Sequence, residues 1–261
     1  DMTVLFENFG MMGWKSGNRY TYAEGSPVTN LFMNLKYLIA RDGIYMNTYD
    51  LTEAYGVGNV KLLQNNHYLP MGFMTNSELA GWQVNQNEDQ FNPFDTQNEF
   101  FKLATGIKDD VYTPLEVVSQ GHTDYTQFPV NKTDYGRYSF NCNDTTVTPH
   151  VKWNYEAPKD GLYLMYADIS GGDDVTVMIN DVAQSKTYGM GRSYIACIGQ
   201  CKKGDKISVY SNLQQGQSGS AMVFVDVLNQ DVFEEGYKKL SNSVMTVSYT
   251  HLRAHETLRH L

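Results

Sequence analysis

Hydrophobic and polar positions alternate through the second half of the chain, as they do in half-buried β-strands. The stretch VKWNYE places Val151, Trp153 and Tyr155 on one side of an extended chain and three polar residues on the other. Similar runs at 162–169, 175–180, 206–213 and 218–228 follow turn sequences such as PKDG and KKGD. The pattern predicts a β-sandwich or jelly roll over residues 111–230. Its expected core takes residues from the main strands: Val151, Trp153, Leu164, Val177, Ile207 and Val223.

The first 110 residues have a mixed pattern that predicts a small α+β unit before the sandwich. Ser26 and Pro27 are typical of a helix start, and strands are expected near 36–40, 60–64 and 71–75. Asn92 and Gly106 bracket a helix predicted at about 93–105, and residues 81–90 are expected to form a loop. A last helix is predicted at 231–240, opening a segment that spans 231–246. The fold class is therefore mainly β with an α+β portion.

Charge and composition narrow the classes of function. The chain of 261 residues carries 20 Lys and Arg against 29 Asp and Glu, a net charge of −9, which argues against nucleic-acid binding. Its apolar runs are far shorter than the ~20 residues that cross a bilayer. Because the sequence begins at Asp1 without a signal peptide, we interpret it as a piece of a longer protein.

Motifs for catalysis are weak throughout the chain. The Gly-x-Gly pairs at 56–58 and 189–191 lack a third glycine, and GWKS lacks the Gly-Lys pair of a P-loop. Ser218 has no glycine two residues later, as a hydrolase nucleophile elbow requires. The histidines of HETLRH are five residues apart rather than four, which puts them out of register for zinc. A carboxylate pair for glycoside hydrolysis is defined by spacing in space, which the sequence leaves open.

Candidate ligand residues are equally sparse. The acidic pairs at 109–110 and 173–174 suit calcium by chemistry, but their turn context favours solvated acids. His67, His122 and His150 stand singly and are interpreted as surface or packed residues. No catalytic, cofactor or metal residue is therefore assigned.

The aromatic content favours carbohydrate binding. With 19 Tyr, 12 Phe and 3 Trp, the chain has many rings on which a sugar could stack. Alternation nevertheless places Trp153 and Tyr155 toward the core, so no carbohydrate-binding residue is assigned; an exposed Trp153 would reverse that interpretation. Free thiols are the default expectation for the three cysteines. If a disulfide forms, it is expected to join Cys142 to Cys201, because both lie at predicted strand ends and Cys197 lies inside a strand.

Several ordered blocks give the chain a family resemblance. LKYLIARDGIYMN, VKLLQNNHYLPMGFM, NPFDTQNEFFKLATG, EAPKDGLYLMYADISG, CKKGDKISV and LNQDVFEEGYKKLS resemble the extracytoplasmic region of bacterial YfhO-type membrane proteins, over most of residues 1–246. The resemblance implies a polytopic protein with a GT-C-like glycosyltransferase core, moving sugar from a lipid-phosphate carrier onto cell-envelope polymers such as lipoteichoic acid. The resemblance implies that its catalytic acids lie in an early extracytoplasmic loop among the membrane helices. That loop is outside this sequence, so no catalytic residue is carried over.

The last residues depart from the family. Residues 247–261, VSYTHLRAHETLRHL, look like a translated sequencing adapter and hold three of the six histidines. We therefore expect a non-native tail that contributes little to the fold.

The leading hypothesis is an accessory, non-catalytic region on the extracytoplasmic face of the bacterial membrane. Its expected partners are an envelope glycan or lipid-linked sugar and the transmembrane portion of its own full-length chain, with no cofactor. Two alternatives stay open: a secreted carbohydrate-binding module of a glycoside hydrolase, and a purely structural envelope domain. Sugar donor, acceptor, linkage and oligomeric state are beyond the sequence.

Overall fold

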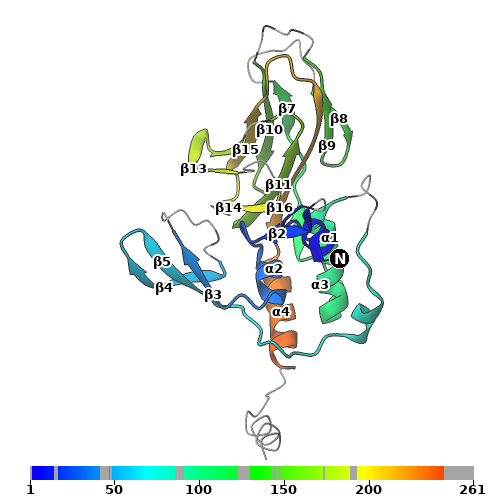
Figure 1. The fold of residues 1–261 in the computed structure, drawn as a ribbon, viewed down its shortest axis with the longest axis vertical. Helices are drawn as coiled ribbons and strands as arrows, with labels where there is room; N and C mark the ends of the chain where they lie inside the picture. Colours follow the sequence, from blue (N-terminus) through cyan, green and yellow to red (C-terminus); the bar gives the residue numbers. More distant parts are fainter. Residues whose placement is uncertain are drawn as a thin grey trace, which may run out of the picture.

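Two antiparallel sheets face each other in the upper half of the molecule (Figure 1). The computed structural model describes residues 2–14, 17–41, 47, 49–85, 87, 91–122, 130–142, 144, 146, 148–172, 174–188 and 193–243. Within them, one sheet has the order β13 (Val182–Tyr188), β12 (Val175–Ile179), β15 (Lys206–Asn212), β10 (His150–Glu156) and β7 (Ser119–His122). The other has β14 (Ile195–Cys201), β11 (Gly161–Ile169), β16 (Gly219–Leu228), β9 (Arg137–Phe140) and β8 (Val130–Asp134), with β6 (Tyr112–Pro114) also paired to β16.

The core between the two sheets confirms the alternating pattern. Val151, Trp153 and Tyr155 are buried at 0%, 0% and 3% exposure, while the residues between them are partly exposed. Because Trp153 is fully enclosed, it is a core residue and not a sugar platform. Val177, Ile207 and Val223 join the same core, so the β-sandwich predicted from the sequence is correct.

Leu164 is the one predicted core residue that lies elsewhere. It is fully buried, but on the opposite face of β11, where it packs with Leu162 and Tyr166 against the helical side of the molecule. Period-2 alternation separates these side chains from Tyr163 and Met165, which face the other sheet. The reason is that β11 is covered on both faces, so apolar side chains continue through the strand instead of alternating.

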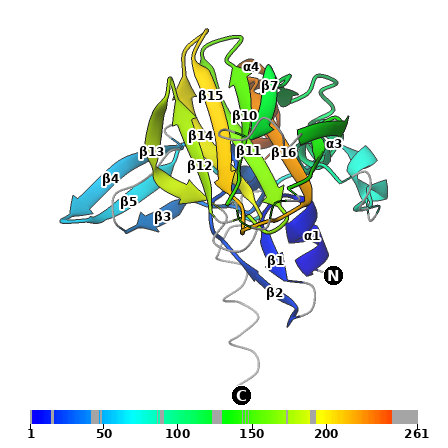
Figure 2. The same ribbon diagram turned by 90° about the horizontal axis from the view of Figure 1, so that it is seen from above.

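Four helices form the layer on that second face, as Figures 1 and 2 show. They are α1 (Met2–Asn8), α2 (Pro27–Phe32), α3 (Pro93–Thr105) and α4 (Gln230–Ser241), counted over the described residues. In α1, Phe6 packs with Phe9 and Met11 in a separate cluster. The buried side chains of α2, α3 and α4 share one core with β11 and β16 that includes Leu31, Phe101 and Phe233. This core crosses residue 110, so the helical segment and the sandwich share buried surface.

The predicted helix signals are confirmed in detail. Ser26 caps α2 by accepting a hydrogen bond from the Thr29 amide at 3.2 Å, and Pro27 occupies the first turn. Asn92 caps α3 in the same way, and Gly106 ends it with the left-handed φ of 71° that favours glycine. The buried Gln97 then ties the helices together, accepting from Ser26 at 2.7 Å and donating to the Phe9 carbonyl at 2.7 Å.

A three-stranded sheet projects from the helical layer to one side in both views (Figures 1 and 2). Its order is β3 (Tyr37–Ala40), β5 (Val60–Asn65) and β4 (Leu51–Val57), all antiparallel. The sequence predicts β3 and β5. A strand expected at 71–75 is wrong, since that segment has only an isolated bridge residue, with Met71 93% exposed. Smaller elements are η2 (Ser77–Gly81) and the pair β1 (Met12–Trp14) with β2 (Arg19–Thr21).

The expected cysteine pairing is also wrong. The Cys142 amide donates to the Ser218 hydroxyl at 2.8 Å, which places Cys142 at the start of β16. Cys201 pairs with Gly161 at the start of β11. Two residues further along β11, Tyr163 pairs with Val227, which lies near the opposite end of β16. Because a strand rises ~3.3 Å per residue, the length of β16 separates the Cα atoms of Cys142 and Cys201 by far more than the ~7 Å that a disulfide allows. Both are buried thiols.

Some expectations concern residues outside the described part of the chain. These are the tail at 247–261, Asp173 and the glycines of 189–191, and the His122 side chain is likewise not described. Among the residues that are described, no helix combines the length and apolar character needed to cross a bilayer.

Candidate functional site

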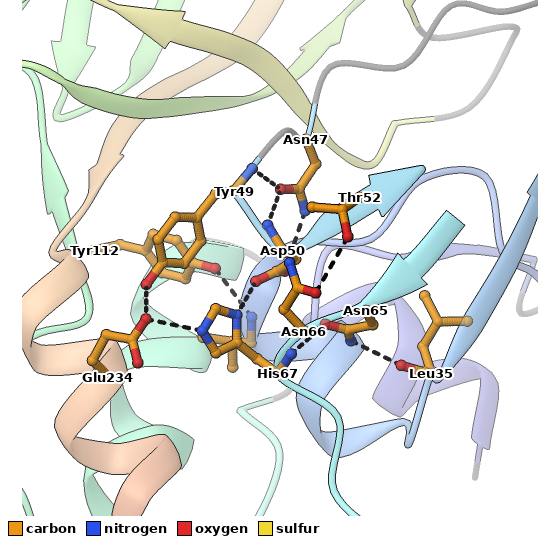
Figure 3. A network of polar contacts seen from close by, with 11 residues as sticks. Leu35, Asn47, Tyr49, Asp50, Thr52, Asn65, Asn66, His67, Tyr112 and Glu234 are labelled. Atoms are coloured by element: carbon orange, nitrogen blue, oxygen red, sulfur yellow. Dashed lines mark hydrogen bonds and ion pairs between the residues drawn. The ribbon is translucent and has the colours of Figure 1, made fainter. Parts of the chain in front are cut away.

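Three ionisable side chains meet where the projecting sheet joins the helical layer (Figure 3). Asp50 directly precedes β4, His67 follows β5 by two residues, and Glu234 belongs to α4. The His67 ring lies between the carboxylates, with Nδ1 3.0 Å from Asp50 Oδ1 and Nε2 2.9 Å from Glu234 Oε1. The Asp50 side chain is fully buried, so this site holds a charge away from water.

Amide side chains fix the backbone around this group. Asn47 donates to Asp50 Oδ2 at 3.2 Å and accepts from the Asp50 amide at 3.1 Å, forming a turn ahead of β4. Asn65 accepts from the His67 amide at 2.8 Å and donates to the Leu35 carbonyl at 2.8 Å. The turns formed by Asn47 and Asn65, before β4 and after β5, therefore orient Asp50 and His67 through contacts that do not involve α4.

Tyr49 covers the outer side of the imidazole. Its ring stacks on His67, with centroids 5.2 Å apart and 18° between the planes, and its hydroxyl donates to Glu234 Oε1 at 2.7 Å. Phe233 closes the group from α4, with its ring edge toward His67 at 5.3 Å. Water is thereby kept from most of the ring, whose side chain is 12% exposed.

The electrostatics favour a protonated imidazole. Burial alone lowers the pKa of His67, but the hydrogen bond and charge of Asp50, followed by the charge and hydrogen bond of Glu234, raise the pKa above its usual range. A neutral imidazole has a single N–H donor, whereas two carboxylates at its two nitrogens are both satisfied only by the imidazolium. Burial and the Glu234 hydrogen bond raise the pKa of Tyr49, so its phenol stays neutral.

This cluster binds elements of the fold together. Both ring nitrogens of His67 are occupied by carboxylates, so neither is available to take a proton from a substrate. In the described ranges, no group of three or more His, Cys, Asp or Glu side chains is placed so that it could hold a metal ion. The arrangement instead links the projecting sheet to α4 through charge-assisted hydrogen bonds.

A cavity of about 260 Å³ adjoins the cluster. Its wall is formed by the segment Tyr22–Gly25 on one side and by Leu38 to Arg41, with Asn47 and Leu51, on the other. Asn47 lines the cavity while it donates to Asp50, so the cavity wall and the buried charge share one residue. Three of the lining residues are polar or charged: Glu24, Arg41 and Asn47.

Tyr22 supplies the aromatic side of the cavity. Its hydroxyl donates to Asn30 Oδ1 at 3.0 Å, which anchors the ring against α2. Burial, together with nearby negative charge that includes Glu24, raises the pKa of Tyr22 above its usual range, so the phenol is neutral. The cavity is therefore lined by a neutral tyrosine together with an acidic, an amide and a basic residue.

The residues singled out by sequence lie apart from this site. Asp110 pairs with Lys102 at 2.6 Å on the surface, and Asp174 is exposed. His150 contacts Asn212 on the neighbouring strand of the same sheet. Ser218 bonds the Asn141 amide oxygen at 2.8 Å in a loop contact. Of the three histidines considered, His67 alone takes part in the buried charge cluster.

Sequence reasoning missed the cluster because its members are distant along the chain. Glu234 lies 167 residues from His67 and 185 from Tyr49. Neither carboxylate has a motif around it, and the α4 stripe that predicts a helix places Glu234 beside Phe233 without showing its partner. The available signal was local. Asn47 stands three residues before Asp50, and Asn65 stands two residues before His67, which are spacings at which an asparagine side chain caps a turn.

The described structure thus defines a β-sandwich protein with a helical layer and a polar cavity at its junction with a projecting sheet. The chain belongs to the family described as bacterial membrane protein YfhO, whose family model matches residues 2–260. The match extends over the last residues, so it does not set the tail apart from the rest. No curated protein matches the chain.

Solved structures resemble part of the chain weakly. A family 35 carbohydrate binding module from Clostridium thermocellum has 14% identity and a TM-score of 0.29, covering 44% of this chain and 96% of that one. A CBM36-1 domain of a multidomain xylanase from a Trinervitermes trinervoides hindgut metagenome has 9% identity and a TM-score of 0.27, covering 44% and 95%. A Podospora anserina GH26-CBM35 mannanase has 11% identity and a TM-score of 0.27, covering 46% of this chain and 28% of that one. At such scores these likenesses carry no argument about function.

Proposed function

We propose that this region is an accessory, non-catalytic part of a membrane glycosyltransferase-like protein, and that it recognises a cell-envelope glycopolymer or lipid-linked sugar on the extracytoplasmic face. The observation that carries the proposal is the cavity in which Tyr22, Glu24, Arg41 and Asn47 converge. Membership of a membrane-protein family supports the first part of the proposal. In this proposal the chemistry is carried out by a GT-C-like core that is not part of the present sequence.

The cavity has the chemistry of a sugar site. Sugar rings offer flat C–H faces, which pack on a tyrosine ring, and hydroxyls, which both donate to carboxylates and accept from amides and guanidinium groups. Its volume of about 260 Å³ lies just below the range of about 300–1,000 Å³ that is usual for drug-sized ligands. The site therefore suits one sugar unit of a polymer, with the neighbouring units outside.

The charge of the chain bears on the acceptor. With a net charge of −9, the protein repels a polyanionic glycopolymer at long range, while Arg41 offers a local cation at the cavity. If the acceptor is anionic, added salt screens the repulsion and strengthens binding. A neutral glycan, by contrast, should bind independently of salt.

Binding to purified glycans tests the proposal. Titrations of the chain with isolated lipoteichoic acid, other envelope glycopolymers and lipid-linked sugars should show binding that Arg41→Ala weakens about tenfold, the effect of losing one charged hydrogen bond. Arg19→Ala is the matched control, because Arg19 is an exposed arginine of β2 that does not line the cavity. Absence of binding to every glycan, or equal effects of the two variants, would leave a purely structural role as the conclusion.

A further inference from the structure

The projecting sheet of β3, β5 and β4 is buried on one face only. Leu63 and Leu51 are 2% and 3% exposed and belong to the covered face. On the opposite face, five large apolar or aromatic side chains are exposed: Tyr37 48%, Ile39 67%, Tyr55 66%, Val57 64% and Val60 44%. A group of this kind on one small sheet is unusual for a surface bathed in water.

The strand register gathers these side chains on a single face. Ile39 pairs with Leu62, which pairs with Tyr55, and residues directly opposite in an antiparallel sheet point to the same side. Val57 pairs with Val60 in the next row toward the hairpin turn. In the row on the other side, Tyr37 pairs with Gln64. The exposed face is therefore a continuous apolar and tyrosine-rich surface, not a scatter of single residues.

Acidic groups are directed away from this face. Glu53 pairs with Leu63 on the covered side and forms an ion pair with Lys61 at 2.7 Å, and Asp50 is enclosed beside His67. Among the rows described above, no position is acidic, although the chain as a whole carries −9.

Basic groups stand at the two ends of β3. Lys36 precedes the strand, with its ammonium 5.5 Å from the centre of the Tyr37 ring, and Arg41 follows it. The surface is thus apolar at its centre and cationic at one margin, in a protein that is otherwise acidic. Such a face is complementary to a surface that is apolar inside and anionic outside.

We infer that the exposed face of the β3–β5–β4 sheet docks on the surface of an anionic lipid bilayer. Tyrosines with aliphatic neighbours are typical of the membrane–water interface, and lysine and arginine at the margin are attracted to anionic headgroups. The chain belongs to a family of bacterial membrane proteins, which favours a lipid bilayer over other partners for this face. Docking would fix the orientation of the cavity at β3 with respect to the membrane, and it does not depend on what the cavity binds.

Vesicle binding measures the inference directly. The chain of residues 1–261 should sediment with vesicles made of phosphatidylcholine and phosphatidylglycerol at about 2:1, and more weakly with phosphatidylcholine alone, because part of the attraction is electrostatic. Val57→Glu should lower the partition coefficient about tenfold or more, since it puts a carboxylate into the contact. Val182→Glu should leave it unchanged.

Val182 is a closely matched control. It is 65% exposed against 64% for Val57, and both lie in edge strands beside a hairpin turn, but Val182 belongs to β13 of the sandwich. Failure of the unmodified chain to bind either vesicle overturns the inference, and so do equal losses in the two variants. If the chain does not bind vesicles but forms a dimer in solution, and Val57→Glu dissociates that dimer, the partner of this face is a second copy of the chain.

An environment-sensitive label covers the case in which Val57→Glu disturbs folding. A bimane attached through Val57→Cys should shift to the blue on adding the mixed vesicles, whereas the same label through Val182→Cys should not. The native cysteines are buried, so labelling is selective for the introduced thiols. Spectra that stay the same at position 57 contradict docking through this face.

Discussion

At the scale of single residues, the imidazole of His67 makes the structure sensitive to pH. The ring contacts Asp50 and Glu234 through its two nitrogens, and their hydrogen bonds and charges raise its pKa despite partial burial. A group whose pKa is higher in the folded state contributes stability that is complete below its unfolded pKa, about 6.5, and is lost as pH rises through the folded value. The junction between sheet and α4 should therefore weaken under alkaline conditions.

Replacement of this histidine tests the sign. His67→Gln should reduce the free energy of unfolding by about 1.5–3 kcal/mol near pH 6, the value of a charged hydrogen bond, and by less at pH 9. Thermal melts of both proteins between these pH values give the difference. His150→Gln provides the control, because His150 lies in the sandwich. A difference that grows with pH would contradict the assignment of a raised pKa.

At the scale of secondary-structure elements, the contact between α3 and α4 depends on one glycine. A Cβ added at Gly236 would lie 2.2 Å from Phe101 Cζ, closer than real Cβ atoms come to any neighbour. Gly236→Ala gains about 1 kcal/mol of helix propensity, but overpacking costs about 1–3 kcal/mol. Since Phe101 is fully buried and has little room to move, we expect net destabilisation.

Denaturant unfolding measures that balance. The Gly236→Ala protein should show a lower midpoint with an unchanged slope, while Glu235→Ala, on the exposed neighbouring position, should differ little from the unmodified chain. A midpoint that rises for Gly236→Ala would mean that the helices separate easily, and that the close approach is not a constraint.

The elements that the sequence predicts well are those with one solvent-exposed face and one buried face. β10 alternates strictly, and α3 carries both of its caps in the sequence, so each was expected where it lies. β4 escaped prediction because only its first residue, Leu51, is buried, which leaves no alternation to detect. The short α1 has no acidic residue in its first turn and no basic residue in its last, and its helical form depends on packing instead.

The candidate site was predictable only in part for the same physical reason. Turn residues such as Asn47 act over two or three positions and leave a local signal, but the contact of His67 with Glu234 exists only after the chain has folded. Tyr22, Glu24 and Arg41 likewise meet only when the segment after β2 lies against β3. Long-range packing, which no spacing rule encodes, brings these groups together.

At the scale of the whole molecule, removal of the tail should leave the fold intact. If residues 247–261 are foreign to the family, nothing has selected Leu252, Leu258 and Leu261 to match the packed surface. Deleting 247–261 should therefore leave the melting temperature within error. A clear drop would show that the tail is a native element whose leucines are buried.

The core that α2, α3 and α4 share with β11 and β16 brings together segments near the two ends of the described chain, which affects how the protein folds during synthesis. Leu31 of α2 and Phe233 of α4 are both fully buried in it, although about 200 residues of chain separate them. During synthesis from the N-terminus, the apolar surface of β11 thus stays incompletely covered until α4 has emerged. Contacts of such long sequence separation form slowly, and the incomplete intermediate is prone to aggregate. Biogenesis of this region should accordingly rely on a holding chaperone until α4 has been released.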